Sequence, residues 1–187
     1  KRGEILGVIG PNGAGKTTLF NQMSGFLAPT AGRVAMRAPG GAMTTPTTPD
    51  AFARLGMGRT FQIVQPFGKL TVIENIMIGA FLRHPCVAQA RAVAHRAASL
   101  VGLDHVADVE ARNLPIGDLK RLEVARTLAT EPSILLLDEV MAGQNQTDTQ
   151  KMVEIIRAVR DTGVSVIAIE HNMHAIMRLS DRIVVID

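Results

Sequence analysis

Short, mainly apolar runs alternate along the chain with stretches in which apolar residues recur every three or four positions. The short runs are bounded by glycine or polar residues, as is typical of buried strands, and they lie at residues 5–9, 134–137, 164–169 and 183–186. Because these runs are apolar on both faces and helical stretches separate them, the pattern predicts an α/β fold. Its mostly parallel sheet would be covered by helices on both sides, with ligands beyond the carboxyl ends of the strands.

The stretches with a helical period are predicted at residues 17–25, 70–81, 87–101, from the segment 114–121 to about 130, and 148–161, with a short helix before the last strand. In the helix at 148–161 the apolar residues fall at positions i, i+3, i+4 and i+7; they are Met152, Ile155, Ile156 and Val159. Thr147 and Gln150 are spaced as a capping box that would begin this helix.

Two further segments carry less regular patterns. The helix at 87–101 follows Pro85, ends at Gly102 and has an apolar face that is mostly alanine. Such a face buries little area, so we expect this region to be a mobile subdomain rather than part of the main core. Residues 28–50 are rich in proline, glycine and threonine, which indicates loops around short strands.

Length and charge limit the kind of protein. The 187 residues suit one compact domain over residues 1–187. Lysine and arginine exceed aspartate and glutamate by 20 to 17 and are scattered, so we expect no nucleic-acid binding. The chain starts without methionine and stops directly after a strand-like run, and we expect it to be a piece of a longer protein, truncated at both ends.

Cysteine usage and hydropathy bear on the compartment. The single cysteine, Cys86, cannot form an internal disulfide, which fits a reducing compartment and favours a role as a small buried hydrophobic residue. The apolar runs are far shorter than the roughly 20 residues of a membrane-spanning helix. We therefore expect a cytosolic chain with no transmembrane segment.

The glycine-rich loop after the first strand matches the P-loop pattern, Gly-Pro-Asn-Gly-Ala-Gly-Lys-Thr at residues 10–17, and opens a helix as that motif requires. Its backbone N–H groups and the positive end of the helix would bind phosphates. Lys16 would contact the β- and γ-phosphates, and Thr17 would offer a hydroxyl to Mg²⁺. The predicted ATP-binding residues are Gly10, Pro11, Asn12, Gly13, Ala14, Gly15, Lys16, Thr17 and Thr18.

The apolar strand at 134–137 ends in two adjacent carboxylates, Asp138 and Glu139, the arrangement called Walker B. Asp138 would hold Mg²⁺, and Glu139 would polarise the attacking water. The alternative is an exposed acidic pair at the end of a strand. A P-loop upstream favours the catalytic interpretation.

His171 follows the strand at 164–169, a position that favours a contact with the γ-phosphate. Together with His174 it suggests a metal pair, but no third ligand is evident nearby, so we expect no metal there. Gln62, in Arg-Thr-Phe-Gln at residues 59–62, carries no meaning without the other motifs.

Together these residues resemble the nucleotide-binding domain of ABC (ATP-binding cassette) proteins. The resemblance identifies Gln62 with the Q-loop, a ligand of Mg²⁺ beside Thr17 and Asp138, and His171 with the H-loop. It makes Glu139, His171 and Gln62 the catalytic residues, with ATP and Mg²⁺ as cofactors. It also implies a helical and signature subdomain at about residues 68–131, inserted in the P-loop ATPase core.

The segment Leu-Pro-Ile-Gly-Asp at residues 114–118 takes the place of the family's signature motif, which binds ATP on the partner subunit. The commonest form of this motif is Leu-Ser-Gly-Gly-Gln, so Pro115, Ile116 and Asp118 are departures, while Leu114 and Gly117 are retained. Because a carboxylate aimed at a phosphate would be repelled, we predict that Asp118 points aside.

Two more departures lie near the Walker B carboxylates. Val140 replaces a common proline, and Asn145 takes the place of the usual D-loop aspartate. The family's adenine-stacking aromatic residue normally precedes the P-loop by some twenty residues, outside this chain. The chain has no tyrosine or tryptophan, so adenine stacking is not assigned.

The segment 59–67, the Leu-Pro-x-Gly signature and Ala-Gly-x-Asn at residues 142–145 resemble the ATP-binding subunits of branched-chain amino acid importers. The resemblance implies a peripheral subunit on the cytoplasmic face of the cell membrane. It would form a head-to-tail dimer with itself or a homologous ATPase subunit and bind permease subunits through the surface near Gln62. The cargo would be branched-chain amino acids or related small polar solutes such as urea or short amides. The alternatives are a non-transport ABC ATPase in DNA repair or translation, and a regulatory module that binds nucleotide without hydrolysing it.

Overall fold

A parallel sheet forms the centre of the computed structural model, which describes residues 2–38 and 41–187. Among these residues, five strands are hydrogen-bonded in the order β4-β5-β6-β1-β7, and every neighbouring pair is parallel. Their bounds are β1 Ile5–Ile9, β4 Met57–Arg59, β5 Ile134–Asp138, β6 Ser165–Ile169 and β7 Arg182–Val185. The sequence-based prediction of an α/β fold with a mostly parallel sheet is confirmed.

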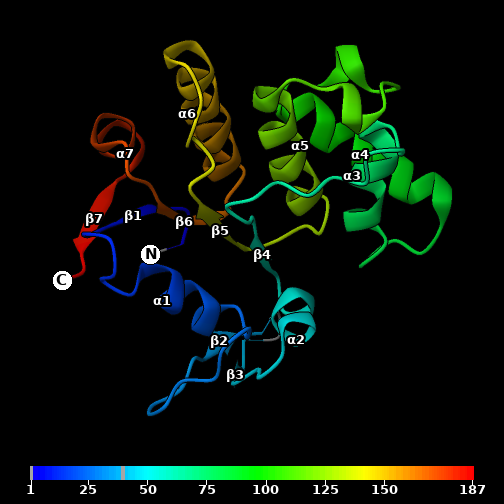
Figure 1. Ribbon diagram of the computed structural model, residues 1–187. Helices are drawn as coiled ribbons and strands as arrows, with labels where there is room; N and C mark the ends of the chain where they lie inside the picture. Colours follow the sequence, from blue (N-terminus) through cyan, green and yellow to red (C-terminus); the bar gives the residue numbers. More distant parts are fainter. Residues whose placement is uncertain (1, 39–40) are drawn as a thin grey trace.

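Apolar side chains project from both faces of the sheet. For this reason apolar and polar residues do not alternate along its strands. Along β5, Leu135 and Leu137 join one buried cluster, with α6 (Gln146–Asp161) and α7 (Met173–Leu179). Leu136 joins a second cluster on the opposite face, with Phe20 from α1 (Lys16–Met23). Figure 1 shows α1 on one side of the sheet and α6 and α7 on the other.

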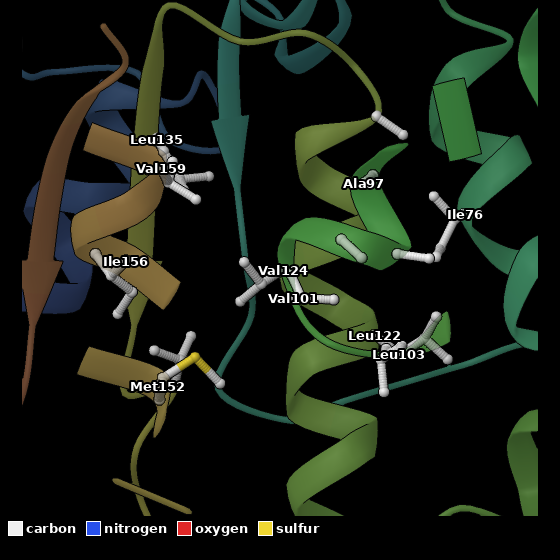
Figure 2. Packing of buried hydrophobic residues seen from close by; sticks show 14 of the residues in the cluster. Ile76, Ala97, Val101, Leu103, Leu122, Val124, Leu135, Met152, Ile156 and Val159 are labelled. Carbon is white, nitrogen blue, oxygen red and sulfur yellow. The ribbon is translucent and has the colours of Figure 1, made fainter. Parts of the chain in front are cut away.

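The helix α6 is amphipathic, as its sequence pattern predicts. Met152, Ile156 and Val159 are buried along one side of it (Figure 2), and Ile155 is partly buried. The predicted capping box was wrong, because the helix begins at Gln146, two residues before its predicted start at residue 148. Asn145 is the N-cap, and its side-chain oxygen accepts a hydrogen bond from the backbone N–H of Asp148 at 2.8 Å.

A group of helices lies beyond the β4 edge of the sheet (Figure 1). It comprises α3 Val72–Ala80, α4 Val87–Leu100, the 3-10 turns Asp104–Val106 and Ala111–Asn113, and α5 Ile116–Leu128. The predictions at 70–81 and 87–101 and of a helix ending near residue 130 are confirmed within a few residues. The alanines on the inner face of α4, among them Ala90, Ala94 and Ala98, are fully buried. Cys86 is exposed at the start of α4, so the prediction of a buried cysteine was wrong.

The segment between α1 and β4 covers the same face of the sheet as α1. It carries the short antiparallel strands β2 (Met36–Arg37) and β3 (Met43–Thr44), as expected for loops around short strands. It also contains α2 (Pro49–Arg54), which the sequence pattern did not predict. Within the described ranges, no helix is both long enough and apolar enough to cross a membrane.

Gly79 lets α3 and α5 approach closely. A Cβ atom built at this position would lie 2.0 Å from the carbonyl oxygen of Arg126, which is backbone and cannot rotate away. Helix α3 is also fixed at its start by a complete capping box between Thr71 and Glu74. Its close contact with α5 therefore depends on the missing side chain at Gly79.

We predict that Gly79→Ala destabilises the protein by about 2 kcal/mol or more, because overpacking at this crossing forces the two helices apart. Urea unfolding followed by circular dichroism measures the change. Gln89→Ala, at an exposed position of α4, is the control and should stay within about 0.5 kcal/mol of the parent. Equal stabilities of the Gly79 variant and the parent would contradict the close approach.

Candidate functional site

The predicted site residues other than the signature segment come together at one edge of the sheet. The P-loop follows β1, and Gln62 lies three residues beyond the end of β4. Glu139 directly follows β5, and His171 lies two residues beyond the end of β6. Because all these strands are parallel and adjacent, their carboxyl ends meet, which is where ligands of such sheets bind.

The P-loop backbone adopts conformations that favour glycine. Gly13 and Gly15 have φ values of 89° and 86°, in the left-handed region. Gly10 has a different constraint, because a Cβ atom there would lie 2.2 Å from the carbonyl oxygen of Ile186. The loop therefore turns sharply at two points and passes close to the backbone after β7.

Lys16 is buried at the centre of the P-loop. Its Nζ donates hydrogen bonds to the carbonyl oxygens of Gly10 and Pro11, each at 2.8 Å. Gly15 is the N-cap of α1, and no side chain of the described residues caps this helix. The first N–H groups of α1 thus remain available to an anion, beside the exposed Thr17 and Thr18.

The carboxylate of Glu139 is held from two sides. Gln62 Nε2 donates to Oε2 at 2.8 Å, and His171 Nε2 lies 2.8 Å from Oε1. The Glu139 side chain is 14% exposed and that of His171 is 47% exposed, so the group lies at the mouth of the site. Residues from three different strand ends therefore converge on a single carboxylate.

The backbone of Glu139 is strained. Its φ is 52°, in the left-handed region that non-glycine residues seldom adopt. Its N–H donates to the carbonyl oxygen of Ile169 at 3.0 Å, which ties this residue to β6. Such strain persists where the surroundings enforce it, and it is common at functional sites.

Thr17, Gln62 and Asp138 line one cavity of ≈ 570 Å³. Together they offer a hydroxyl, an amide oxygen and a carboxylate, the hard oxygen donors that Mg²⁺ prefers. Because Gln62 Nε2 donates a hydrogen bond to Glu139, the Oε1 atom of Gln62 is the one available to a metal. The residues present fit a magnesium site.

Arg59 lies against Asp138 and was not predicted as a site residue. Its Nη2 is 3.3 Å from Asp138 Oδ2, and the same guanidinium donates to Asn21 Oδ1 at 2.8 Å and Ser24 Oγ at 2.7 Å. Burial raises the pKa of the Asp138 carboxyl, and the positive charge of Arg59 acts in the opposite direction. Arg59 thus compensates part of the cost of burying this carboxylate.

The signature segment forms the start of α5. Pro115 is the N-cap, Leu114 is buried and Ile116 is exposed. Asp118 is buried, and its carboxylate pairs with Arg121 one turn along the helix. A Cβ atom at Gly117 would lie 3.2 Å from the Asp148 carboxylate, which leaves little room for a side chain there.

The chain after Glu139 is fixed by a buried glutamate that sequence reasoning missed. Val140 and Met141 are buried, and the N–H of Met141 donates to Glu170 Oε1 at 2.9 Å. Asn145, at the predicted D-loop position, caps α6. Glu170 directly precedes His171, and this position in the sequence was the one feature that could have indicated that Glu170 belongs to the site.

The two histidines that suggested a metal pair have different surroundings. His174 lines one between α6 and α7, with Asn172 and Arg178, while His171 contacts Glu139. Over residues 2–38 and 41–187, no group of three histidine, cysteine or acidic residues is arranged to hold a metal ion.

Comparison with known proteins gives a consistent set of relatives. A family profile described as ABC transporter matches residues 1–142. The chain is 40% identical over 206 aligned positions to the high-affinity branched-chain amino acid transport ATP-binding protein LivG of Escherichia coli (strain K12), covering 98% of this chain and 77% of that protein. Its identity to the probable branched-chain amino acid transport ATP-binding protein LivG of Archaeoglobus fulgidus is 37%, with 99% and 76% covered. A solved ATP-binding cassette of an ABC transporter in its ADP conformation superposes with a TM-score of 0.85 at 28% identity, covering 99% of this chain and 77% of that one.

We predict that Glu170 makes folding stability depend on pH. Burial, with a further contribution from the charge of Glu139, raises the pKa of Glu170 from an ordinary 4.5 to about 7. The folded state therefore keeps a proton that the unfolded state releases, so the contribution of Glu170 to stability is fully present below pH 4.5 and is lost as pH rises through about 7.

Glu170→Gln keeps an oxygen that can accept the hydrogen bond from the Met141 N–H, and it removes the carboxyl group that titrates. Between pH 5 and pH 8 its stability should rise relative to the parent by up to about 3 kcal/mol. Urea unfolding at several pH values measures this, with Glu154→Gln, at an exposed position of α6, as the control. Parallel pH profiles for the parent and the Glu170 variant would contradict the prediction.

Proposed function

Because the chain belongs to the ABC transporter family, we propose that it is the ATP-binding and ATP-hydrolysing subunit of an importer for branched-chain amino acids or related small polar solutes. The relatives matched over nearly the whole chain are transport ATP-binding proteins, which favours this function over DNA repair, translation or a regulatory module. The intact P-loop and Walker B carboxylates support turnover of ATP rather than binding alone.

The observation that carries the proposal is the double hold on Glu139. A general base must be presented in a fixed orientation toward the water it activates. Gln62 and His171 each hold one oxygen of this carboxylate at 2.8 Å, and Glu139 lies partly exposed where the nucleotide would bind. Glu139 therefore accepts the proton of the attacking water, while Gln62 and His171 fix its orientation.

The P-loop residues 10–18 bind the phosphates of ATP. The uncapped start of α1 supplies backbone N–H donors, and Lys16 supplies a positive charge already located inside the loop. Thr17, Gln62 and Asp138 would hold Mg²⁺, which neutralises charge on the β- and γ-phosphates when bound. Arg59 keeps Asp138 in place from the protein side.

The signature residues 114–118 complete the ATP site of a partner subunit in a head-to-tail dimer. Pro115 offers no hydroxyl, so Gly117 and the positive end of α5 make the contact. Pairing with Arg121 keeps the Asp118 carboxylate from repelling the partner's ATP. We assign the helical segment at about 68–131 as the subdomain that presents this motif, inserted within the ATPase core.

The subunit acts at a membrane through its partners. Permease subunits would bind near Gln62, where Phe61 and Ile63 are exposed, and would place the chain peripherally on the cytoplasmic face. Recovery of permease subunits, rather than nucleic acid, with the full-length protein tests this assignment.

We predict that Glu139→Gln lowers steady-state ATP turnover by about 100-fold or more, because the amide cannot accept a proton. ATP affinity should stay within about threefold, since the P-loop is unchanged, and ATP should still drive dimer formation. A coupled phosphate-release assay and size-exclusion chromatography with ATP measure the two effects.

Glu131→Gln is a matched control, because Glu131 shares the φ of 52° but lies at the surface, beside His84 and Arg96. It should leave turnover unchanged. Unchanged turnover in the Glu139 variant itself would remove the base from the mechanism.

A further inference from the structure

Helix α5 carries a buried polar stripe. Lys120, Glu123 and Thr127 fall at i, i+3 and i+7 on one face and are 5%, 3% and 8% exposed. Leu122 and Val124 of the same helix are part of the apolar core (Figure 2). Charged side chains are seldom buried to this extent unless they have specific partners.

Backbone atoms of Arg59, the last residue of β4, and of the segment that follows it lie against this stripe. Lys120 Nζ donates to the Gln62 carbonyl oxygen at 3.2 Å, and the Phe61 N–H donates to Glu123 Oε1 at 2.6 Å. Thr127 Oγ1 donates to the Glu123 carbonyl oxygen within α5 at 2.9 Å and lies 3.4 Å from the Arg59 carbonyl oxygen. Along one face of α5, successive side chains thus contact the backbones of Gln62, Phe61 and Arg59.

The stripe also contacts Glu139, which accepts the side-chain hydrogen bond of Gln62. Lys120 Nζ lies 3.4 Å from the Glu139 carbonyl oxygen as well as 3.2 Å from that of Gln62. The side chains of Gln62 and Glu139 are themselves joined at 2.8 Å. A single ammonium group therefore bridges the backbones of the two residues whose side chains must meet.

We propose that Lys120 and Glu123 are positioning residues that set the orientation of Glu139 by fixing the backbone of Phe61 and Gln62 to α5. The inference rests on the proposed role of Glu139 as the base. The start of the same helix is the signature segment, so a shift of α5 at the partner's ATP would move Gln62 at this subunit's own ATP. The stripe gives the two sites a continuous physical connection.

Stability alone does not account for the stripe. Glu123 Oε2 is buried and has no hydrogen-bond partner within the described part of the chain. Burial raises the pKa of Glu123, so its charged form is held at a cost. Replacing buried charged residues by apolar residues of similar size commonly leaves the folding stability unchanged or increases it.

The test is a double-mutant cycle in the full-length subunit, assembled with its permease partners. Glu123→Leu should lower kcat about tenfold or more, because the base loses its alignment, while the Kd for ATP stays unchanged. Glu123→Gln, whose amide oxygen can still accept from Phe61, should restore most of kcat. In a Gln62→Ala background, Glu123→Leu should have little further effect, since the connection is already broken.

Lys120→Met, taken through the same cycle, repeats the test if Glu123→Leu does not fold. Asn75→Leu is the matched control, because Asn75 is a buried polar residue of α3 that bonds the backbone of Phe67 instead. Its effect should be equal in both backgrounds. Equal losses of kcat in both backgrounds for Glu123→Leu, or for Lys120→Met in its place, would overturn the positioning role. Absence of ATP turnover in the parent assembly would overturn the proposed function and this inference with it.

Discussion

The hold on Glu139 depends on the parallel register of the central sheet. Only because β4, β5 and β6 run in the same direction and lie side by side do Gln62, Glu139 and His171 emerge at one edge. Apolar side chains on both faces of β5 bury this strand between two layers of helices, at the centre of the molecule. The core and the proposed chemistry are thus consequences of the same arrangement.

The sequence predicted those parts of the molecule whose physical causes are local. Apolar runs identify buried strands, a 3.6-residue period identifies α6, and the P-loop glycines require backbone conformations that few other residues adopt. The segment around β4 was missed because three residues, one of them Gly58, form too short a run to produce a pattern. The start of α6 was misplaced because Asn145 and Thr147 are both good N-cap residues, and tertiary structure decides between them.

Buried polar residues were the main failure of sequence reasoning, for one physical reason. A charged residue at helical spacing normally indicates a solvated face, and Lys120 and Glu123 have no local feature that separates them from such a face. Their burial depends on a segment some sixty positions earlier in the chain. The same is true of Arg59, whose partner Asp138 is on the neighbouring strand.

The hydrogen bonds between α5 and residues 59–62 involve only main-chain atoms of residues 59–62. The Phe61 ring lies against the Arg59 guanidinium, whereas the side chain of Ile63 is exposed and takes no part in those hydrogen bonds. Substitution there can alter the outer surface without altering the hydrogen bonds beneath it. A change of binding partner through Ile63 would therefore leave the proposed catalytic residues in place.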